Sequence, residues 1–233
     1  MNVLNFGKAA AFMAGEGEVD EKALGRELIR ICGKLEEKGL IAATDGNVSC
    51  RLGEDRILIT RSGTAKGDIS VSDLLTVDSQ GKVLAGLGRP SSEIRMHLLV
   101  YEKRPDVQAI VHAHPAMLTA LTLAGVPFDA RMLPEVWLTM GPVPTAPYAT
   151  PSTEEVPRSI APLVEDHQAI LLERHGSLTM GGTLEEAYQR LEKLEHAAHT
   201  LFYARLLGGE KVVPLGPAEL ERLDRVRYKN AGS

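Results

Sequence analysis

The stretch His112-Ala113-His114 has the residue types and the spacing of a metal-binding pair. It ends the apolar run at 107–111 and is followed by a proline. In a strand, side chains two residues apart point to the same face, so both imidazoles would project together at the strand's end. Neutral imidazole is a common metal ligand. The pair is therefore interpreted either as two ligands of one ion or as ordinary strand histidines, and the spacing favours neither.

A third histidine stands in a similar place. His175 terminates the apolar run at 168–172 and is followed by a glycine. If the two runs are strands of one sheet, three imidazoles converge at its rim, and such a set suits a zinc ion that keeps an open coordination position for substrate. Taken alone, His175 is more simply a structural residue.

The other histidines are weaker candidates. His196 and His199 are three residues apart on a predicted helix and could chelate a metal. They lie among alanines and acids, so a solvated or interfacial face is the better interpretation. His97 and His167 have no partner at ligand spacing, and both are interpreted as structural.

Glu93 follows two serines at the start of a predicted helix. Exposed backbone amides and the helix dipole stabilise an anion at such a position. Glu93 is therefore either a plain first-turn acid or a functional carboxylate beside Ser91 and Ser92, with the serines poised for a phosphate, and position alone favours the first. The pairs Gly46-Asn47 and Ser62-Gly63 are equally compatible with ordinary turns.

The elements that would position these residues follow from hydrophobic periodicity. Helices are predicted at 21–39, from 91 to before Arg104, and at 116–123, 152–163 and 184–207. Strands are predicted at 48–52, 57–60, 74–77, 107–111 and 168–172, the first three as an antiparallel meander. Their irregular alternation predicts an α/β fold with a mixed sheet covered by helices on both faces.

Composition limits the function classes. A chain of 233 residues with 44% hydrophobic residues predicts one domain. The net charge of -5, without a Lys/Arg cluster, argues against nucleic-acid binding. Two cysteines give no disulfide framework and fit a reducing cytoplasm. No stretch approaches the roughly 18 apolar residues of a membrane span, and the first 20 residues lack the apolar core of a signal peptide.

Six motifs taken together carry a family resemblance. They are TDGNVS at 44–49, ITRSG at 59–63, PSSE at 90–93, IVHAHP at 110–115, APYA at 146–149 and RHG at 174–176. In order, type and spacing they resemble the class II aldolase/adducin family, within it the L-fuculose-1-phosphate aldolase branch. The resemblance covers about residues 21–210 as one domain. It implies a three-layer α/β/α fold with a central mixed, mainly antiparallel sheet, a flexible segment at 1–20, and a tail at 211–233 placed to cover the active site.

The resemblance also implies roles for residues. His112, His114 and His175 would bind Zn²⁺, with Mn²⁺ or Co²⁺ as other candidates, and Glu93 would complete the metal site and act as general acid/base. The phosphate pocket would be formed by two turns and the serine pair: Gly46, Asn47, Ser62, Gly63, Ser91 and Ser92.

The implied function is a cytoplasmic, zinc-dependent aldolase. It would cleave a ketose 1-phosphate of the L-fuculose, 5-deoxypentulose or methylthioribulose type to dihydroxyacetone phosphate and a small aldehyde. The family also implies a homotetramer with active sites between subunits. The alternatives are a decarboxylase or dehydratase of the same fold, and a pentulose-phosphate 4-epimerase, whose branch has aspartate where this chain has Glu93. A non-catalytic adducin-like module is disfavoured because all four candidate ligands are present.

One departure concerns the aldehyde side of the site. The fuculose aldolase branch uses a tyrosine from a neighbouring subunit, contributed by the segment before APYA, and the corresponding stretch here is RMLPEVW at 131–137. Glu135 and Tyr228 are candidate substitutes. Leu133 or Trp137 could line a more apolar aldehyde side, which would suit a 5-deoxypentulose or methylthio-pentulose phosphate.

Overall fold

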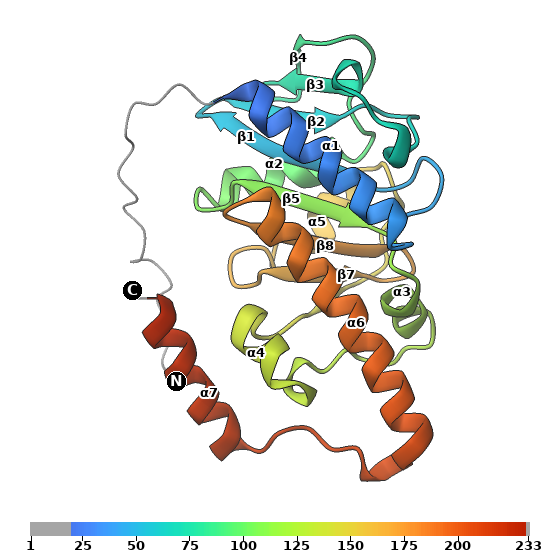
Figure 1. The fold of residues 1–233 in the computed structure, drawn as a ribbon, viewed down its shortest axis with the longest axis vertical. Coiled ribbons are helices and arrows are strands. Elements are labelled where there is room, and N and C mark those ends of the chain that lie inside the picture. Colours follow the sequence, from blue (N-terminus) through green and yellow to red (C-terminus); the bar gives the residue numbers. More distant parts are fainter. Residues whose placement is uncertain (1–19, 232–233) are drawn as a thin grey trace.

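An eight-stranded mixed sheet forms the centre of the molecule (Figure 1). The structure is a computed structural model, and it describes residues 20–231. The predicted flexible segment at 1–20 therefore lies outside the described residues except for Asp20. The strands are β1 Asn47–Gly53, β2 Arg56–Thr60, β3 Leu74–Val77, β4 Val83–Ala85, β5 Ala109–Ala113, β6 Thr145–Ala146, β7 Ala169–Leu172 and β8 Gly176–Gly181.

The strand order is β4-β3-β2-β1-β5-β8-β7-β6. Every neighbouring pair is antiparallel except β6 and β7, which are parallel. The predicted meander is confirmed as β1–β2–β3, and β4 extends it. The seven α-helices of the described chain are α1 Glu21–Glu37, α2 Ile94–Lys103, α3 Ala116–Leu123, α4 Pro134–Met140, α5 Glu155–Ile160, α6 Leu184–Gly208 and α7 Pro217–Ala231.

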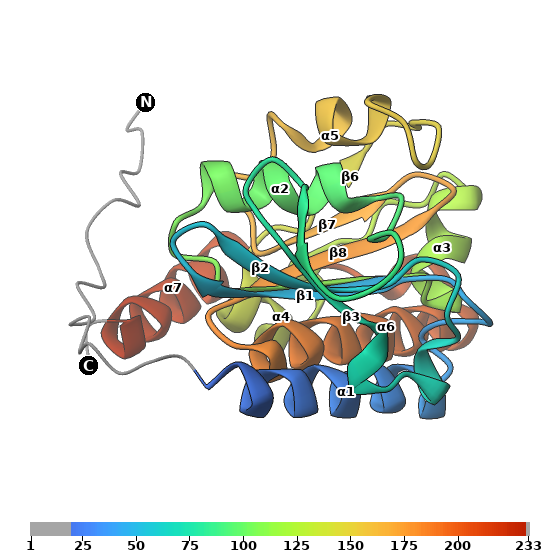
Figure 2. The same cartoon turned by 90° about the horizontal axis from the view of Figure 1, so that it is seen from above.

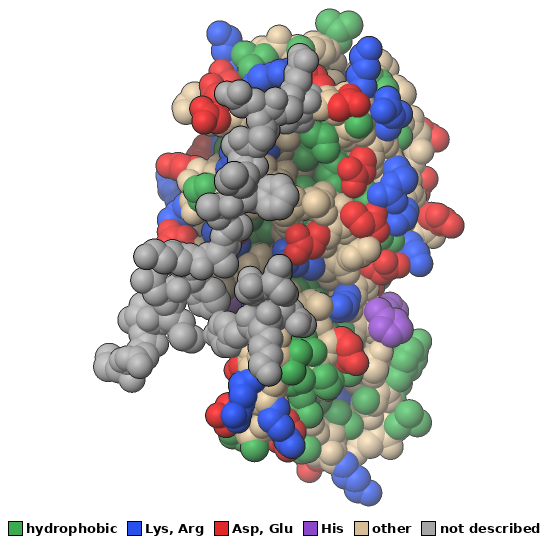
Figure 3. Space-filling view, turned by 60° about the vertical axis from the view of Figure 1, so that its left-hand side comes forward, with side chains coloured by type: hydrophobic (Ala, Val, Ile, Leu, Met, Phe, Trp, Pro, Cys, Tyr) green, Lys and Arg blue, Asp and Glu red, His purple; other side chains and the backbone are tan. Residues whose placement is uncertain are grey.

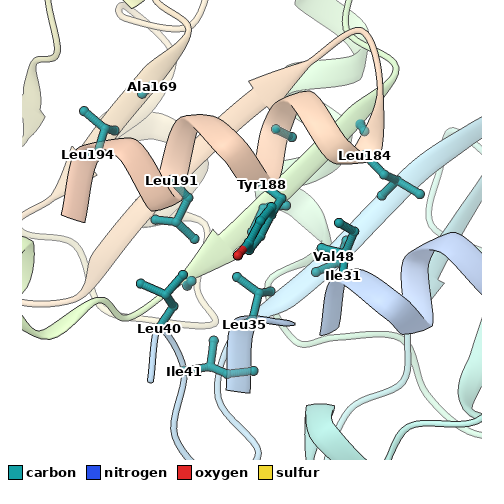
Figure 4. Close-up of a cluster of buried hydrophobic side chains, with 14 of the residues drawn as sticks. Ile31, Leu35, Leu40, Ile41, Val48, Ala169, Leu184, Tyr188, Leu191 and Leu194 are labelled. Atoms are coloured by element: carbon teal, nitrogen blue, oxygen red, sulfur yellow. The ribbon is translucent and has the colours of Figure 1, made fainter. Parts of the chain in front are cut away.

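Helices cover both faces of the sheet, as predicted. Figure 2 shows α2 and α5 on one face and α1 and α6 on the other. On the α1/α6 face, apolar side chains at spacings of three and four interlock (Figure 4): Ile31 and Leu35 of α1 meet Tyr188 and Leu191 of α6 over Val48 of β1. A second buried cluster lies under α2 and α5. The fold is thus the predicted three-layer α/β/α architecture.

The structure contains a central strand that the sequence pattern did not predict. Strand β8 pairs with both β5 and β7, and all six of its residues are buried. Its sequence, GSLTMG, has only two apolar residues, Leu178 and Met180, which alternate with Ser177 and Thr179 between two glycines, and this run is too short to stand out as a strand. The short edge strands β4 and β6, and helix α4, were also not predicted.

The predicted tail at 211–233 contains α7. This helix contacts α4, where Nε1 of Trp137 donates a hydrogen bond to Oδ1 of Asp224 at 2.8 Å. Within the described part of the chain, no helix has the length and apolar character needed to cross a membrane. On the face shown in Figure 3, basic side chains are interspersed with acidic ones.

Glu195 of α6 holds the segment that follows the histidine pair. Its buried carboxylate accepts hydrogen bonds from the backbone N–H groups of Met117 and Leu118, at 2.8 and 3.0 Å, in the first turn of α3. An acidic group there also complements the helix dipole. Because α3 begins two residues after His114, this contact fixes the chain just past the strand end.

We expect Glu195→Ala to lower the free energy of unfolding by about 2 kcal/mol, because two buried amides lose a charged acceptor. Urea unfolding followed by circular dichroism measures the change. The control is Glu192→Ala on the same helix, which removes an exposed ion pair with Lys38 and should cost about 0.5 kcal/mol or less. Equal losses in the two variants would contradict this account.

Candidate active site

Four side chains from three separate parts of the chain converge at one end of the central strands. They are Glu93, His112, His114 and His175, and one candidate ligand atom of each lies within 4.8 Å of the others. Nε2 of His112 is 2.9 Å from Oε2 of Glu93, and Nε2 of His175 is 3.2 Å from Oε1 of the same carboxylate. The three imidazole rings are mutually 4.8–4.9 Å apart between centroids. Among the residues that the structure describes, this is the single such cluster.

Strand pairing sets the positions of the histidine pair. Strand β5 lies between β1 and β8, with His112 opposite Asn47 on one side and opposite Leu178 on the other. The ring of His112 is fixed by a 2.9 Å hydrogen bond between its Nδ1 and the carbonyl oxygen of Ser177. This bond requires a proton on Nδ1 and leaves the Nε2 lone pair facing the cluster, which is the arrangement of an oriented metal ligand.

His175 reaches the cluster from the turn between β7 and β8. Arg174 adopts a left-handed conformation with φ of 59° at this turn, which is uncommon for a residue with a side chain. The next residue, Gly176, lies so close to β5 that a Cβ atom would collide with the carbonyl oxygen of Ala113. A tight hairpin and a small residue therefore bring His175 beside His114.

Gly46 permits the close approach of the turn before β1. Its φ is 71°, and a Cβ atom on it would lie 2.9 Å from the carbonyl oxygen of His112. Only glycine fits there without displacing the strand. The turn at 44–47 is thereby held directly over the cluster.

The protonation states follow from burial and neighbouring groups. Burial, with repulsion from His112, lowers the pKa of His175 to about 4, so its imidazole is neutral near pH 7. Burial also lowers the pKa of His114. Burial by itself would raise the pKa of Glu93, but the adjacent imidazoles and a hydrogen bond from Asn47 outweigh it and hold that pKa well below its usual range. The Glu93 carboxylate therefore lies beside the neutral imidazoles of His114 and His175.

These donors fit a divalent cation. Oε1 of Glu93 is buried without a hydrogen-bond partner, although Nε2 of His175 is near. The Nε2 atoms of His112 and His114 lie 3.0 Å apart. When His114 carries its proton on Nδ1, which faces Oδ2 of Asp45 at 3.5 Å, two nitrogen lone pairs face each other there. A cation would satisfy all of these atoms at once. Three imidazoles and one displaceable carboxylate are typical of a site that binds zinc or a similar ion for catalysis.

A polar cavity of about 280 Å³ adjoins the cluster. The lining includes Glu93, His114 and His175, and it also includes every residue predicted for the phosphate pocket: Gly46, Asn47, Ser62, Gly63, Ser91 and Ser92. The sequence therefore predicted which turns meet. Other lining residues were not predicted, among them Arg61, Lys66 and Ser152.

Lys66 is the most informative of the residues that were missed. Its side chain is 2% exposed, and its ammonium donates hydrogen bonds to the carbonyl oxygens of Thr44 and Thr64, at 3.0 and 2.7 Å. It thus ties together the two turns that line the cavity and retains one further N–H. Burial lowers the pKa of Lys66, so an anion in the cavity would stabilise its charged form. The signal in the sequence was a lysine three residues after the Ser62-Gly63 turn.

The remaining candidates lie elsewhere. His196 is exposed on α6, and His199 is paired with Glu195 at 3.2 Å on the same helix. Glu135 is exposed on α4 and does not line the cavity. Leu133 and Trp137 pack against the α1/α6 core. The side chain of Tyr228 lies outside the described part of the structure.

Comparison with known proteins supports a common origin for this arrangement. The family described as Class II Aldolase and Adducin N-terminal domain matches residues 26–202. A 3-oxo-tetronate 4-phosphate decarboxylase of Escherichia coli is 33% identical over 207 residues, covering 87% of this chain and 96% of that protein. A 5-methylthioribulose-1-phosphate/5-deoxyribulose-1-phosphate aldolase of Rhodospirillum rubrum is 32% identical, covering 86% and 89%. A solved L-fuculose 1-phosphate aldolase superposes with a TM-score of 0.80 at 31% identity, covering 91% and 99%.

We expect the purified protein to bind one divalent ion per chain at this cluster. His112→Ala should weaken binding by at least about 100-fold, because it removes one of four donors from the site. Cobalt titration followed by visible absorption measures the affinity. His196→Ala is the matched control, since it removes an exposed histidine outside the cluster. If His196→Ala lost cobalt binding while His112→Ala retained it, the metal would be bound outside this cluster.

Proposed function

The chain belongs to the class II aldolase and adducin family, and on this premise we propose that it is a metal-dependent carbon–carbon lyase that releases dihydroxyacetone phosphate. The observation that carries the proposal is the placement of Glu93 and three imidazoles at the end of a cavity lined by turn amides, serine hydroxyls and Lys66. This arrangement joins a site for electrophilic catalysis to a site for a phosphate.

Two bond cleavages lead to the same reactive species. Decarboxylation of 3-oxo-tetronate 4-phosphate breaks the bond between the carboxylate carbon and its neighbour, and the electron pair moves onto the adjacent carbonyl oxygen. Retro-aldol cleavage of a ketose 1-phosphate between C3 and C4 moves an electron pair in the same way. Each yields the enediolate of dihydroxyacetone phosphate, with CO₂ or an aldehyde as the other fragment. Protonation of the enediolate carbon then gives the ketone.

Phosphate binding, proton transfer and metal binding would be carried out by different residues of the site. The cavity residues would hold the phosphate, so that its binding energy positions the reacting carbons near the cluster. Glu93 is ionised in the resting site, so it would first take up a proton from solvent while substrate is bound and then deliver that proton to the enediolate carbon as general acid. A divalent ion held by His112, His114 and His175 would supply Lewis-acid stabilisation of the developing oxyanion.

The missing tyrosine favours decarboxylation as the first candidate. Retro-aldol cleavage requires a base that removes the proton from the hydroxyl group that becomes the aldehyde. CO₂ departs without a proton transfer at the leaving group. The segment at 131–137 has no tyrosine, and none lines the cavity among the residues that the structure describes. The likeness to the decarboxylase over 96% of its length supports the same choice.

Aldol cleavage is the second candidate. It is supported by the likeness to the methylthioribulose-phosphate and fuculose-phosphate aldolases, and it requires a base from outside the described cavity. Our proposal includes assembly as a homotetramer with active sites between subunits. Exposed apolar side chains on the last turns of α6, including Phe202, Leu206 and Leu207, supply surface suited to such contacts.

We expect the metal-loaded protein to release dihydroxyacetone phosphate from 3-oxo-tetronate 4-phosphate faster than from L-fuculose 1-phosphate or methylthioribulose 1-phosphate. A coupled dehydrogenase assay measures the product. Glu93→Gln should lower kcat by at least about 100-fold, because the proton donor is lost. The control is Glu165→Gln, an exposed carboxylate paired with Lys103. Absence of product from every substrate, or activity that survives both chelation and Glu93→Gln, would refute the lyase proposal.

We expect Lys66→Met to raise KM for the phosphorylated substrate by about 10- to 100-fold, because a buried hydrogen-bonded charge opposite the phosphate is lost. kcat should change much less, since Lys66 is distant from the reacting carbons in this proposal. Steady-state kinetics separates the two parameters. Lys38→Met, which removes an exposed lysine, should leave both unchanged. A fall in kcat with KM unchanged would show that Lys66 does not bind the phosphate.

A further inference from the structure

A ladder of polar side chains connects β1 to α2 behind the cluster. Asn47 and Ser49 are two residues apart on β1 and point to the same face of the sheet. His97 and Tyr101 are four residues apart on α2 and point toward that face. All four side chains are buried, with Ser49 and His97 fully so. The sequence analysis interpreted His97 as structural, and the structure places it between a strand and the carboxylate of the active site.

The hydrogen bonds of this ladder form one continuous chain. The hydroxyl groups of Tyr101 and Ser49 are 2.8 Å apart, and Oγ of Ser49 is 2.7 Å from Nδ1 of His97. Nε2 of His97 is 2.5 Å from Oδ1 of Asn47. Nδ2 of Asn47 donates to Oε2 of Glu93 at 3.1 Å. His97 therefore contacts no candidate metal ligand itself and reaches Glu93 only through the Asn47 amide.

The number of protons on these side chains determines which group donates in each hydrogen bond. Burial lowers the pKa of His97 to about 3, so the imidazole is neutral and carries one proton. If that proton is on Nε2, it is donated to Asn47 Oδ1. The Ser49 hydroxyl then donates to Nδ1, and the Tyr101 hydroxyl donates to Ser49. Every proton is used once, and each buried acceptor within the ladder is satisfied.

The other tautomer of His97 would make Asn47 present its carbonyl oxygen, instead of its N–H, to Glu93. With its proton on Nδ1, His97 would turn a lone pair toward Asn47, and the amide would have to rotate to donate to it. The carbonyl oxygen of Asn47 would then face the carboxylate of Glu93, and two acceptors would oppose each other in a buried site. The tautomer of His97 thus determines whether Glu93 meets a donor or an acceptor.

We propose that His97 is a positioning residue, which, as its Nε2–H tautomer, locks the side-chain amide of Asn47 so that it donates to Glu93. The lock holds the carboxylate aimed at the metal site before substrate binds. This inference rests on the proposed function for the catalytic role of Glu93, but the tautomer and the metal site can be measured without turnover. The same face of α2 carries the buried apolar residues Met96 and Val100, so packing alone does not require an imidazole at this position.

The test compares His97→Gln with His97→Phe. The glutamine amide can donate to Asn47 and accept from Ser49, whereas phenylalanine fills the space without either bond. We expect His97→Phe to lower kcat and to weaken cobalt binding by about 10-fold or more each, with KM changing by less than about 3-fold, and His97→Gln to restore most of both losses. His167→Phe is the control, because the ring of His167 bonds the carbonyl oxygen of Leu163 and takes no part in this network.

A second measurement does not depend on any variant folding. Nitrogen-15 spectra of the imidazoles in the wild-type protein should show His97 neutral, with its proton on Nε2. A proton on Nδ1, or equal kcat and cobalt affinity in His97→Gln and His97→Phe, would overturn the inference. If the wild-type protein turns over no phosphorylated substrate, the proposed function fails, while the tautomer and the cobalt affinities still decide the role of His97.

Discussion

The structure depends on one electrostatic constraint, which is the burial of the Glu93 carboxylate. A charge removed from water is tolerated only where cations or hydrogen-bond donors replace the solvent. Here the amide of Asn47 supplies a donor to one oxygen, while the other oxygen is turned toward His175 without a hydrogen-bond partner. The cluster is therefore satisfied only partly by the protein itself. A divalent ion would complete it, and that incompleteness makes the site suited to catalysis rather than to stability.

The sheet supplies the positions that this constraint requires. Strand β5 carries His112 at its end, and its two neighbours bring the other groups to the same place: β1 brings Asn47, and the turn before β8 brings His175. Helix α2 places Glu93 across from them. The close approaches depend on the absence of a side chain at Gly46 and Gly176. A three-layer fold therefore gives a rigid frame in which ligands from distant parts of the chain meet within hydrogen-bond distance.

The parts of this arrangement that sequence could predict are those with a local signal. Helix and strand periodicity predicted α1, α3, α6 and the β1–β3 meander, and the motifs brought together the residues that line the cavity. Strand β8 gave too weak a signal because only Leu178 and Met180 are apolar in it, although all six of its residues are buried. Lys66 and His97 were missed for a different reason. Their roles come from contacts with residues distant in sequence, Thr44 for Lys66 and Asn47 for His97. A lysine after a turn or a histidine on a helix is only a weak local signal for such a role.

The division of the site into two ends explains why one fold can serve several reactions. In the proposed function, one end would recognise a phosphate through neutral turn amides and the buried ammonium of Lys66, and the other would manage an enediolate through the cluster and Glu93. Neither end depends on the fragment that leaves. A fragment that departs as CO₂ needs no further acid or base, whereas an aldehyde needs one, and the stretch at 131–137 provides no tyrosine for it. In the proposed function, the leaving-group side, rather than the metal or the phosphate pocket, would therefore decide which reaction this chain performs.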